Sequence, residues 1–233
     1  MAEERAQDRL ANALRRVLAL RAQLAQDVAQ TARRRDVKRW QSQRLRGTYQ
    51  DLFAQARYAQ AGEFFLTELY GDRDFTRRDS EALRIVPKLA RFLPDRALTT
   101  LAMAIELDEL SEVLDARVAA QVGLPIDEAS YARAYCVAGT RAERERQIEM
   151  VDRIGQALDH LAGRPGLVSM LRLMRGPAQV AGLDHLHRFL QIGFDAFRAM
   201  RGGAEFLATI RARETDLMRA LFAGGGAGER REG

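Results

Sequence analysis

The sequence predicts an all-α protein, a single bundle of about eight or nine helices with an amphipathic helix at its N-terminus. Apolar residues recur at spacings of three and four along most of the chain, which is the period of one helix face. Capping residues and glycines recur between these stretches, and only five prolines interrupt them. Nowhere do apolar and polar residues alternate over the length of a β-strand.

The first predicted helix covers residues 3–32. Its apolar residues form one narrow seam, which Arg21 interrupts; they are Leu10, Leu14, Val17, Leu24 and Val28. Such a seam can pack against the rest of its own chain, or it can pair with a protein partner or with a second copy in a homodimer. The sequence leaves these alternatives open because the seam is shorter than a typical coiled coil.

A second helix is predicted over residues 36–70, after the basic run at 33–35. Its last two turns read EFFLTELYG and are apolar around most of the circumference. We therefore expect Phe64, Phe65 and Leu66 to be buried on several sides. Gly71 is suited to end this helix because glycine readily adopts the left-handed conformation of a helix C-terminus.

The remaining helices are marked by caps and breaks. Asp95 is a favourable N-cap, and Thr140 with Glu143 forms a capping box. The helix at 178–200 is apolar nearly all round, so we expect it at the centre of the fold. The predicted ranges are 76–93 with a kink or break at Pro87, 96–122, 128–138, 141–162, 167–174, 178–200 and 204–222.

Three segments are predicted: a basic amphipathic helix at 1–34, a helical core domain at 35–223 and a disordered Gly-rich tail at 224–233. The charge is concentrated near the N-terminus. Residues 1–48 contain 12 Lys and Arg against 5 Asp and Glu, a net charge of +7. The other 185 residues contain 25 against 27, a net charge of −2. The total of +5 therefore arises from the first fifth of the chain.

Composition excludes several classes of protein. A chain with 47% hydrophobic residues can bury a core and is not a disordered protein. The single cysteine rules out an internal disulfide framework and a cysteine-based zinc cluster. No apolar run approaches the roughly 20 residues of a transmembrane helix. The start, MAEERAQDRL, is charged and lacks the apolar segment of a secretory signal, so a cytoplasmic location is expected.

The segment from Phe64 to Gly71, followed by Asp74-Phe75 and Arg78-Asp79, resembles a bacterial family named for this signature, the FFLEELY-motif proteins. Thr67 stands where the family's name has Glu. The similarity covers about residues 36–222 and continues through Trp40-Gln41, Leu110-Ser111, Leu114-Asp115, Arg144–Ile148 and Arg213-Glu214. The resemblance implies a bacterial helical domain of unassigned function, and it transfers no catalytic or cofactor-binding residue.

The sequence contains little evidence for a metal or cofactor site. The chain lacks the paired Glu-x-x-His motifs of a di-iron bundle, and we predict no metal and no cofactor. His187 lies on an apolar helix face. It is interpreted as a core histidine with a backbone partner, and the functional alternative is an axial ligand to haem held between helices.

No catalytic residue is predicted. Cys136 lies among apolar and aromatic neighbours, which favours a small buried hydrophobe over a catalytic thiolate. The chain has no Gly-x-Ser-x-Gly elbow, and its Gly-rich tail lacks the residues that follow a phosphate-binding loop. Nothing in the sequence favours an enzyme.

The basic segment 33–46 is the strongest feature outside the predicted core. It contains seven positive charges and one acidic residue, and its candidate interaction residues are Arg33, Arg34, Arg35, Lys38 and Arg39. These side chains are interpreted as a solvated face, or as partners of the acidic face formed by Asp108, Glu112 and Asp115. The alternatives are contact with nucleic acid, which no helix-turn-helix signature supports, and contact with an acidic protein or an anionic membrane surface.

Three functions follow from these observations. The first hypothesis is a non-enzymatic protein-interaction module. The alternative is a small-molecule binding or sensor domain, with haem as one possible ligand, that has its pocket between the helices at about 178–200 and 204–222. The third is a nucleic-acid-associated protein that uses segment 33–46.

Overall fold

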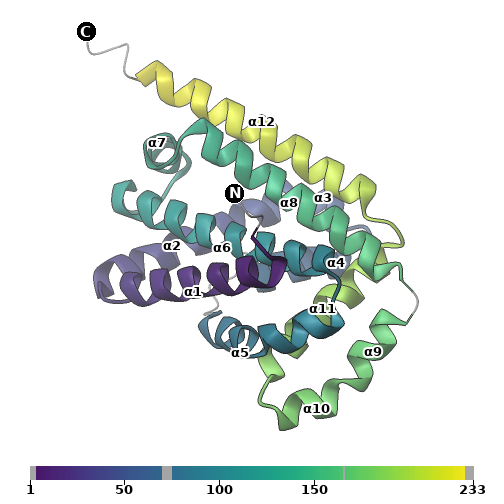
Figure 1. Cartoon of the computed structure of the whole chain (residues 1–233). Coiled ribbons are helices and arrows are strands. Elements are labelled where there is room, and N and C mark those ends of the chain that lie inside the picture. The colour runs from purple at the N-terminus through teal and green to yellow at the C-terminus, as the bar shows by residue number, and fades with distance from the viewer. Residues whose placement is uncertain (1–3, 70–74, 165, 229–233) are drawn as a thin grey trace.

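The computed structural model describes residues 4–69, 75–164 and 166–228 and confirms the all-α class (Figure 1). These residues form 12 α-helices, nine of them with seven residues or more, and one π-helical segment, with no strand. No helix within the described residues is both long enough and apolar enough to span a bilayer. The elements are α1 (Ala6–Leu24), α2 (Val28–Thr48), α3 (Gln50–Phe53), α4 (Ala59–Phe64), η1 (Phe65–Leu69), α5 (Thr76–Phe92), α6 (Asp95–Gln121), α7 (Glu128–Ala138), α8 (Arg141–Ala162), α9 (Leu167–Leu173), α10 (Arg175–Val180), α11 (Asp184–Met200) and α12 (Ala204–Gly228).

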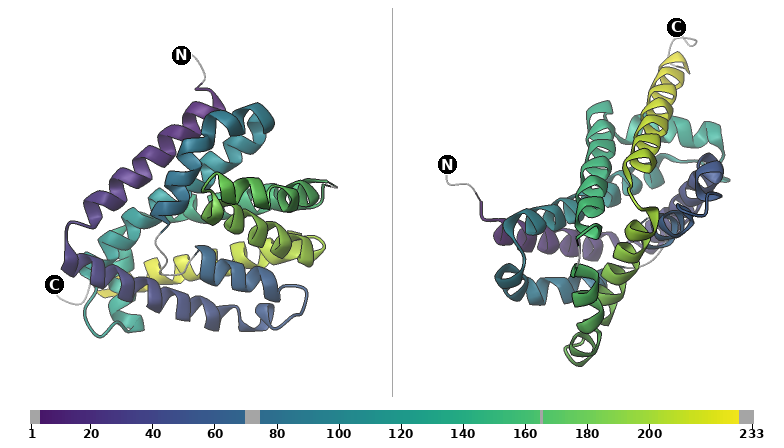
Figure 2. Two further views of the ribbon diagram at one scale, coloured as in Figure 1. Left: turned by 90° about the horizontal axis from the view of Figure 1, so that it is seen from below. Right: turned by 90° about the vertical axis from the view of Figure 1, so that its right-hand side faces the viewer.

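The long helix α6 is the central element, with α1, α2, α5, α7 and α8 packed around it (Figures 1 and 2). The expectation that the helix at 178–200 lies at the centre is therefore wrong. That stretch divides into α10 and α11, which meet at a turn containing Gly182, whose φ of +64° suits a residue without a side chain. The helix α11 packs against α4, α5, α8, α9 and α10 on one side of the bundle.

Three of the five seam residues of the first predicted helix are buried within their own chain, whereas Leu24 is half-buried and Val28 is exposed at the start of α2. Leu10, Leu14 and Val17 are at most 3% exposed, and Leu10 and Leu14 pack with Val86 of α5 and Leu98 of α6. Of the two alternatives for this seam, packing on the rest of the chain is the one present in the structure. The first helix ends at Leu24, and α2 begins at Val28 after Asp27, whose carboxylate accepts from the Gln30 amide. The basic run at 33–35 consequently lies inside α2. The predicted boundary after residue 34 therefore falls within a helix and not between two segments.

The largest core cluster lies where η1 meets α4, α8, α11 and α12. Phe64, Phe65 and Leu66 are buried there, as the apolar end of the predicted second helix indicated. The Phe65 ring packs against the rings of Phe197 and Phe206, with centroids 6.4 and 5.6 Å away. The expected single helix at 36–70 is in fact divided into α2, α3, α4 and η1. Tyr70, Gly71 and Asp74 lie outside the described residues.

Several helix ends follow the predicted local chemistry. Thr140 and Glu143 form the capping box at the start of α8. The helix α5 continues through Pro87, so of the expected kink or break the break does not occur. The helix α12 extends to Gly228, beyond the expected end at 222, so the predicted tail at 224–233 lies partly within α12 and partly outside the described residues.

A carboxylate from α5 holds the start of α11. Buried Glu81 accepts hydrogen bonds from the backbone amides of His185 and Leu186, each at 3.1 Å, and it lies 2.9 Å from His185 Nδ1. An anion at this position satisfies amides that have no partner within the helix and opposes the positive end of the helix dipole.

Candidate functional site

A buried charged cluster joins α1, α2, α5 and α6. Its centre is Arg21, whose guanidinium donates to Asp79 and Asp108 at 2.6 Å each and lies 3.5 Å from Glu112. Arg78 of α5 adds a second guanidinium on Asp79 at 2.7 Å. The side chains of Arg21 and Asp79 are only 9% and 1% exposed. Arg21, the residue that interrupts the seam of α1, thus connects that helix to two others.

The structure brings part of the basic segment 33–46 into this cluster. Lys38 Nζ donates to Glu112 at 2.8 Å, and Arg34 Nη1 donates to the same carboxylate at 3.4 Å. Exposed Arg39 pairs with half-buried Asp36 on its own helix, Arg33 is half-buried and Arg35 is exposed. The predicted pairing with the acidic face of α6 therefore occurs for two of the five candidate residues.

The acidic residues of α6 differ in the direction in which their surroundings shift the pKa. Burial disfavours the charged form of Glu112, but Lys38 and the two neighbouring arginines outweigh it, so its pKa is lowered. Burial raises the pKa of Asp108 in spite of Arg21 and Arg78. Burial likewise raises the pKa of Asp115, whose Oδ1 accepts from Gln41 Nε2 at 2.9 Å. The surrounding cations thus outweigh burial at Glu112, whereas burial outweighs the cations at Asp108 and Asp115.

A second polar cluster, here called the arginine–tyrosine cluster, lies between α2, α6, α7, α8 and α12. Arg44 of α2 donates to both carboxylate oxygens of Glu214 at 3.1 and 3.3 Å. The Tyr49 hydroxyl donates to Glu214 at 2.7 Å. Burial raises the pKa of Tyr131 and of Tyr135, which keeps both phenols protonated. Its members are Gln41, Arg44, Asp115, Tyr131, Tyr135, Arg144, Gln147 and Glu214.

Five of the residues that carry the further family resemblance belong to this cluster, and Trp40 and Ser111 contact it. Gln41 donates to Asp115 and to the Tyr131 hydroxyl, and Trp40 stacks on the Tyr131 ring at 4.1 Å. Gln147 Nε2 donates to Ser111 at 2.9 Å. These residues are distant in the sequence, and the resemblance alone did not show that the fold brings them together.

Within the cluster, Arg144 has the most side-chain nitrogens that lack a hydrogen-bond acceptor. It is 3% exposed, and its guanidinium lies over the Tyr135 ring at 4.0 Å. Nη1 donates to Gln147 Oε1 at 3.3 Å, whereas Nε and Nη2 are buried and have no hydrogen-bond partner among the described residues. Such a group in a folded protein calls for an explanation, because a buried donor without a partner costs free energy.

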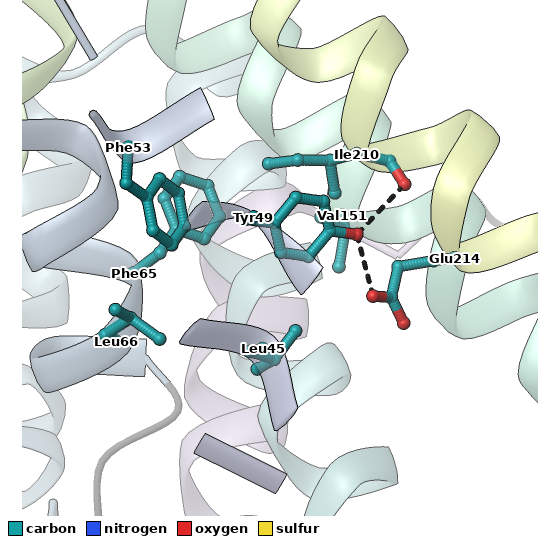
Figure 3. A pocket seen from close by; sticks show the side chains of 8 residues that line it. All are labelled: Leu45, Tyr49, Phe53, Phe65, Leu66, Val151, Ile210 and Glu214. Atoms are coloured by element: carbon teal, nitrogen blue, oxygen red, sulfur yellow. Dashed lines mark hydrogen bonds between the residues drawn. The ribbon is translucent and has the colours of Figure 1, made fainter. Parts of the chain in front are cut away.

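A small cavity lies beside this cluster (Figure 3). Its volume of about 20 Å³ is room for a single water molecule. Tyr49, between α2 and α3, extends its hydroxyl toward the Glu214 carboxylate and the Ile210 carbonyl of α12, and the Phe53 and Phe65 rings close the far side. The cavity lies next to α12, as the predicted pocket does, but none of the residues that line it belongs to α11.

The histidines and the cysteine have local partners. His187 Nε2 lies 2.7 Å from the Leu171 carbonyl oxygen, which only accepts, so this nitrogen carries the proton. A backbone partner is what the core-histidine interpretation of His187 expects, and haem ligation remains an untested alternative. Cys136 Sγ is 3.2 Å from the Leu221 carbonyl oxygen. Within the described ranges, no three His, Cys, Asp or Glu side chains are grouped in a way that could hold a metal ion.

The structure has an exposed apolar surface on α9 and α10, where the sequence predicts only a short apolar helix at 167–174. Leu173 is 80% exposed and Val180 is 93% exposed, while Met170 and Met174 are each about half exposed. Met170, Leu173 and Met174 follow each other at spacings of three and one, so they share one side of the chain there. Figures 1 and 2 show α9 and α10 at the end of the molecule away from α7.

Comparison with known proteins gives a family without an assigned activity. No curated protein and no solved structure matches the chain. A family model described as a domain of unknown function, DUF8198, matches residues 20–227, from the second half of α1 nearly to the end of α12. Because the match covers most of the chain, this protein belongs to the DUF8198 family.

Proposed function

We propose that the protein is a cytoplasmic, non-enzymatic interaction module that binds an acidic segment of a partner protein through α9 and α10. The observation that carries the proposal is the exposure of four large apolar side chains on these two short helices: Met170, Leu173, Met174 and Val180. Single exposed apolar residues are ordinary, but a group of them on one projecting element is typical of an interaction site.

The charge of this element determines the kind of partner. Residues 164–182 contain Arg164, Arg172 and Arg175 and no Asp or Glu. Arg172 reaches Asp195 of α11 at 3.4 Å, and Arg175 is exposed. An acidic segment with apolar side chains would therefore cover the methionines and leucine while its carboxylates face the arginine rim.

A protein partner fits this surface better than a lipid bilayer does. The helices α9 and α10 have seven and six residues, whereas helices that lie in a membrane interface usually present a longer apolar face. Two methionines and a leucine give an adaptable surface that can pack against a partner side chain. Burying such a side chain contributes roughly 1.5–3 kcal/mol, so a few contacts can anchor a short segment.

The proposal is tested by site-specific photo-crosslinking in the native host. A photoreactive amino acid is placed at position 173 in one variant and at position 137 in the control, because Val137 is also exposed, at 71%, but lies on α7. The proposal expects one dominant adduct, at position 173 only, in which the attached partner peptide is acidic. Equal adducts at both positions, or an adduct with lipid at position 173, would refute it.

A further inference from the structure

Large apolar side chains are also exposed at the end of the molecule away from α9 and α10. Val28 is 80% exposed and begins α2, directly after the α1–α2 turn, and Leu124 is 60% exposed in the loop between α6 and α7. Ile126 of this loop packs in one core cluster with Val37 of α2, so the loop lies beside that helix. Figures 1 and 2 show the α1–α2 turn and the α6–α7 loop at one end of the molecule and α9 and α10 at the other.

The two ends carry charges of opposite sign. Residues 22–32 and 118–132, which contain these two exposed side chains, include three acidic residues and no Lys or Arg. The acidic residues are all exposed: Asp27, Asp127 and Glu128. Residues 164–182 show the reverse, with three arginines and no Asp or Glu. Each end thus presents apolar side chains among charges of one sign, and the two ends are complementary. We call the α1–α2 turn and the α6–α7 loop, with these three acidic residues, the acidic end.

The charged groups of both ends are accessible to a partner. Glu128 and Arg175 are exposed, and neither forms an ion pair with another residue of the described chain. Asp27 and Asp127 each accept one backbone amide at the start of a helix, while their side chains face solvent. Because a carboxylate accepts several hydrogen bonds, an arginine can bind either of them without displacing the helix cap.

We propose that α9 and α10 of one copy bind the acidic end of a second copy of this chain. The inference rests on the proposed function, because it uses the same surface and identifies its acidic partner as the chain itself. The contact is head-to-tail. Pairing of α9 and α10 with the same two helices of another copy would bring the arginines of both copies together, which is unfavourable. A head-to-tail contact leaves one basic and one acidic end open, so further copies can add.

Photo-crosslinking of the purified full-length protein identifies the segment that α9 and α10 contact. With the photoreactive amino acid at position 173, an adduct of two chains should form, and trypsin should release position 173 joined to residues 118–133 or 22–33, the peptides of the acidic end. Attachment to residues 164–182 of the second copy would show two-fold pairing and overturn the proposal. Adducts with another host protein, and none between copies, would overturn self-association but support the proposed function.

Sedimentation equilibrium measures the association itself. The mean mass of the wild type should rise with protein concentration and fall with added salt, which screens the charges between the two ends. Leu173→Ser removes an apolar anchor from the basic end and Leu124→Ser removes one from the acidic end, so each should raise the dissociation constant roughly tenfold or more. Val28→Ser is a second variant of the acidic end, and an unaltered melting temperature shows that each variant is folded. Val137→Ser, an exposed change in the last turn of α7, should associate like the wild type.

A mixture of the Leu173→Ser and Leu124→Ser variants tests the head-to-tail geometry. The first variant keeps an intact acidic end and the second keeps intact α9 and α10, so the mixture should form a complex of two chains with an affinity close to that of the wild type. Neither variant should associate in this way alone. A mixture that associates no better than its components, or a wild type that stays monomeric at every concentration, would overturn the proposal. An acidic partner from the host, crosslinked at position 173, would in that case still support the proposed function.

Discussion

Arg21 of α1 and Asp79 of α5 form an ion pair with 2.6 Å between Nη1 and Oδ2, in a place where both side chains are shielded from water. The same guanidinium binds Asp108 of α6 at 2.6 Å, and burial alone would lower the Arg21 pKa, but these two carboxylates raise it instead. The ion pair therefore ties the N-terminal helix to the bundle by charge, in addition to the apolar contacts of its seam.

Arg21→Met should destabilise the protein by about 3–5 kcal/mol, the usual cost of removing one partner from a buried ion pair. The loss arises because Asp79 and Asp108 remain buried without their main cation. Urea unfolding measures it. Arg16→Met is the matched control on the same helix, since the exposed Arg16–Glu109 pair is worth no more than about 1 kcal/mol. Similar midpoints for the two variants would show that the buried cluster contributes little.

Removal of residues 1–35 should abolish cooperative unfolding. The sequence alone placed residues 1–34 outside the core domain, but Leu14 and Val17 are fully buried and Arg21 is bound by carboxylates of α5 and α6. A chain that begins at Asp36 would expose those partners. Urea unfolding followed by circular dichroism is the measurement, and a sharp two-state transition of the shortened chain would contradict this expectation.

Phe65→Ala should cost about 3–5 kcal/mol, the range for truncation of a buried phenylalanine. The ring is 8% exposed and packs in the largest core cluster. Thr67→Ala is the control: its hydroxyl donates to the Glu63 carbonyl one turn earlier, so its loss should be nearly neutral. Melting curves of monomeric protein compare them, and a shift of less than a degree or two for Phe65→Ala would mean that the segment is not structural.

Asp115→Asn should change the pH dependence of stability. Burial raises the pKa of Asp115, so the folded protein retains a proton that the unfolded chain has already lost near pH 4. Stability contributed by this carboxyl is therefore present below about pH 4 and declines as the pH rises to the raised value. The free energy of unfolding of wild type, minus that of the variant, should fall with rising pH above about 4. A difference that grows with pH would show that Lys38 and Arg144 dominate over burial.

The fold was predictable where local chemistry determines it. The range of α7 is the predicted one, and α8 begins at the Thr140 capping box as expected. Division of the stretch 36–70 into four elements was predictable only in part. Gly47 weakens the helix next to its end at Thr48, but the packing of Tyr49 and Phe53 on α12 is not visible in the sequence.

The candidate sites were less predictable than the helices. The pairing of Lys38 with Glu112 was one of several alternatives for the basic segment, because the sequence does not give the distance between two helices. The exposure of Leu173 and the isolation of Arg144 had no sequence signal. Apolar runs of the same composition lie in cores and on surfaces, and the partners of an arginine depend on residues far along the chain.

The most direct test of the proposed function is the affinity of the crosslinked partner for a Leu173→Ser variant. Leu173 is 80% exposed, so the change should leave the melting temperature unaltered while removing an apolar anchor. We expect the dissociation constant to rise at least tenfold, since central anchors contribute 1–2 kcal/mol or more, roughly one order of magnitude. Val137→Ser on α7 should leave the affinity unchanged. Equal affinities for Leu173→Ser and the wild type would contradict the assignment of α9 and α10 as the interaction surface.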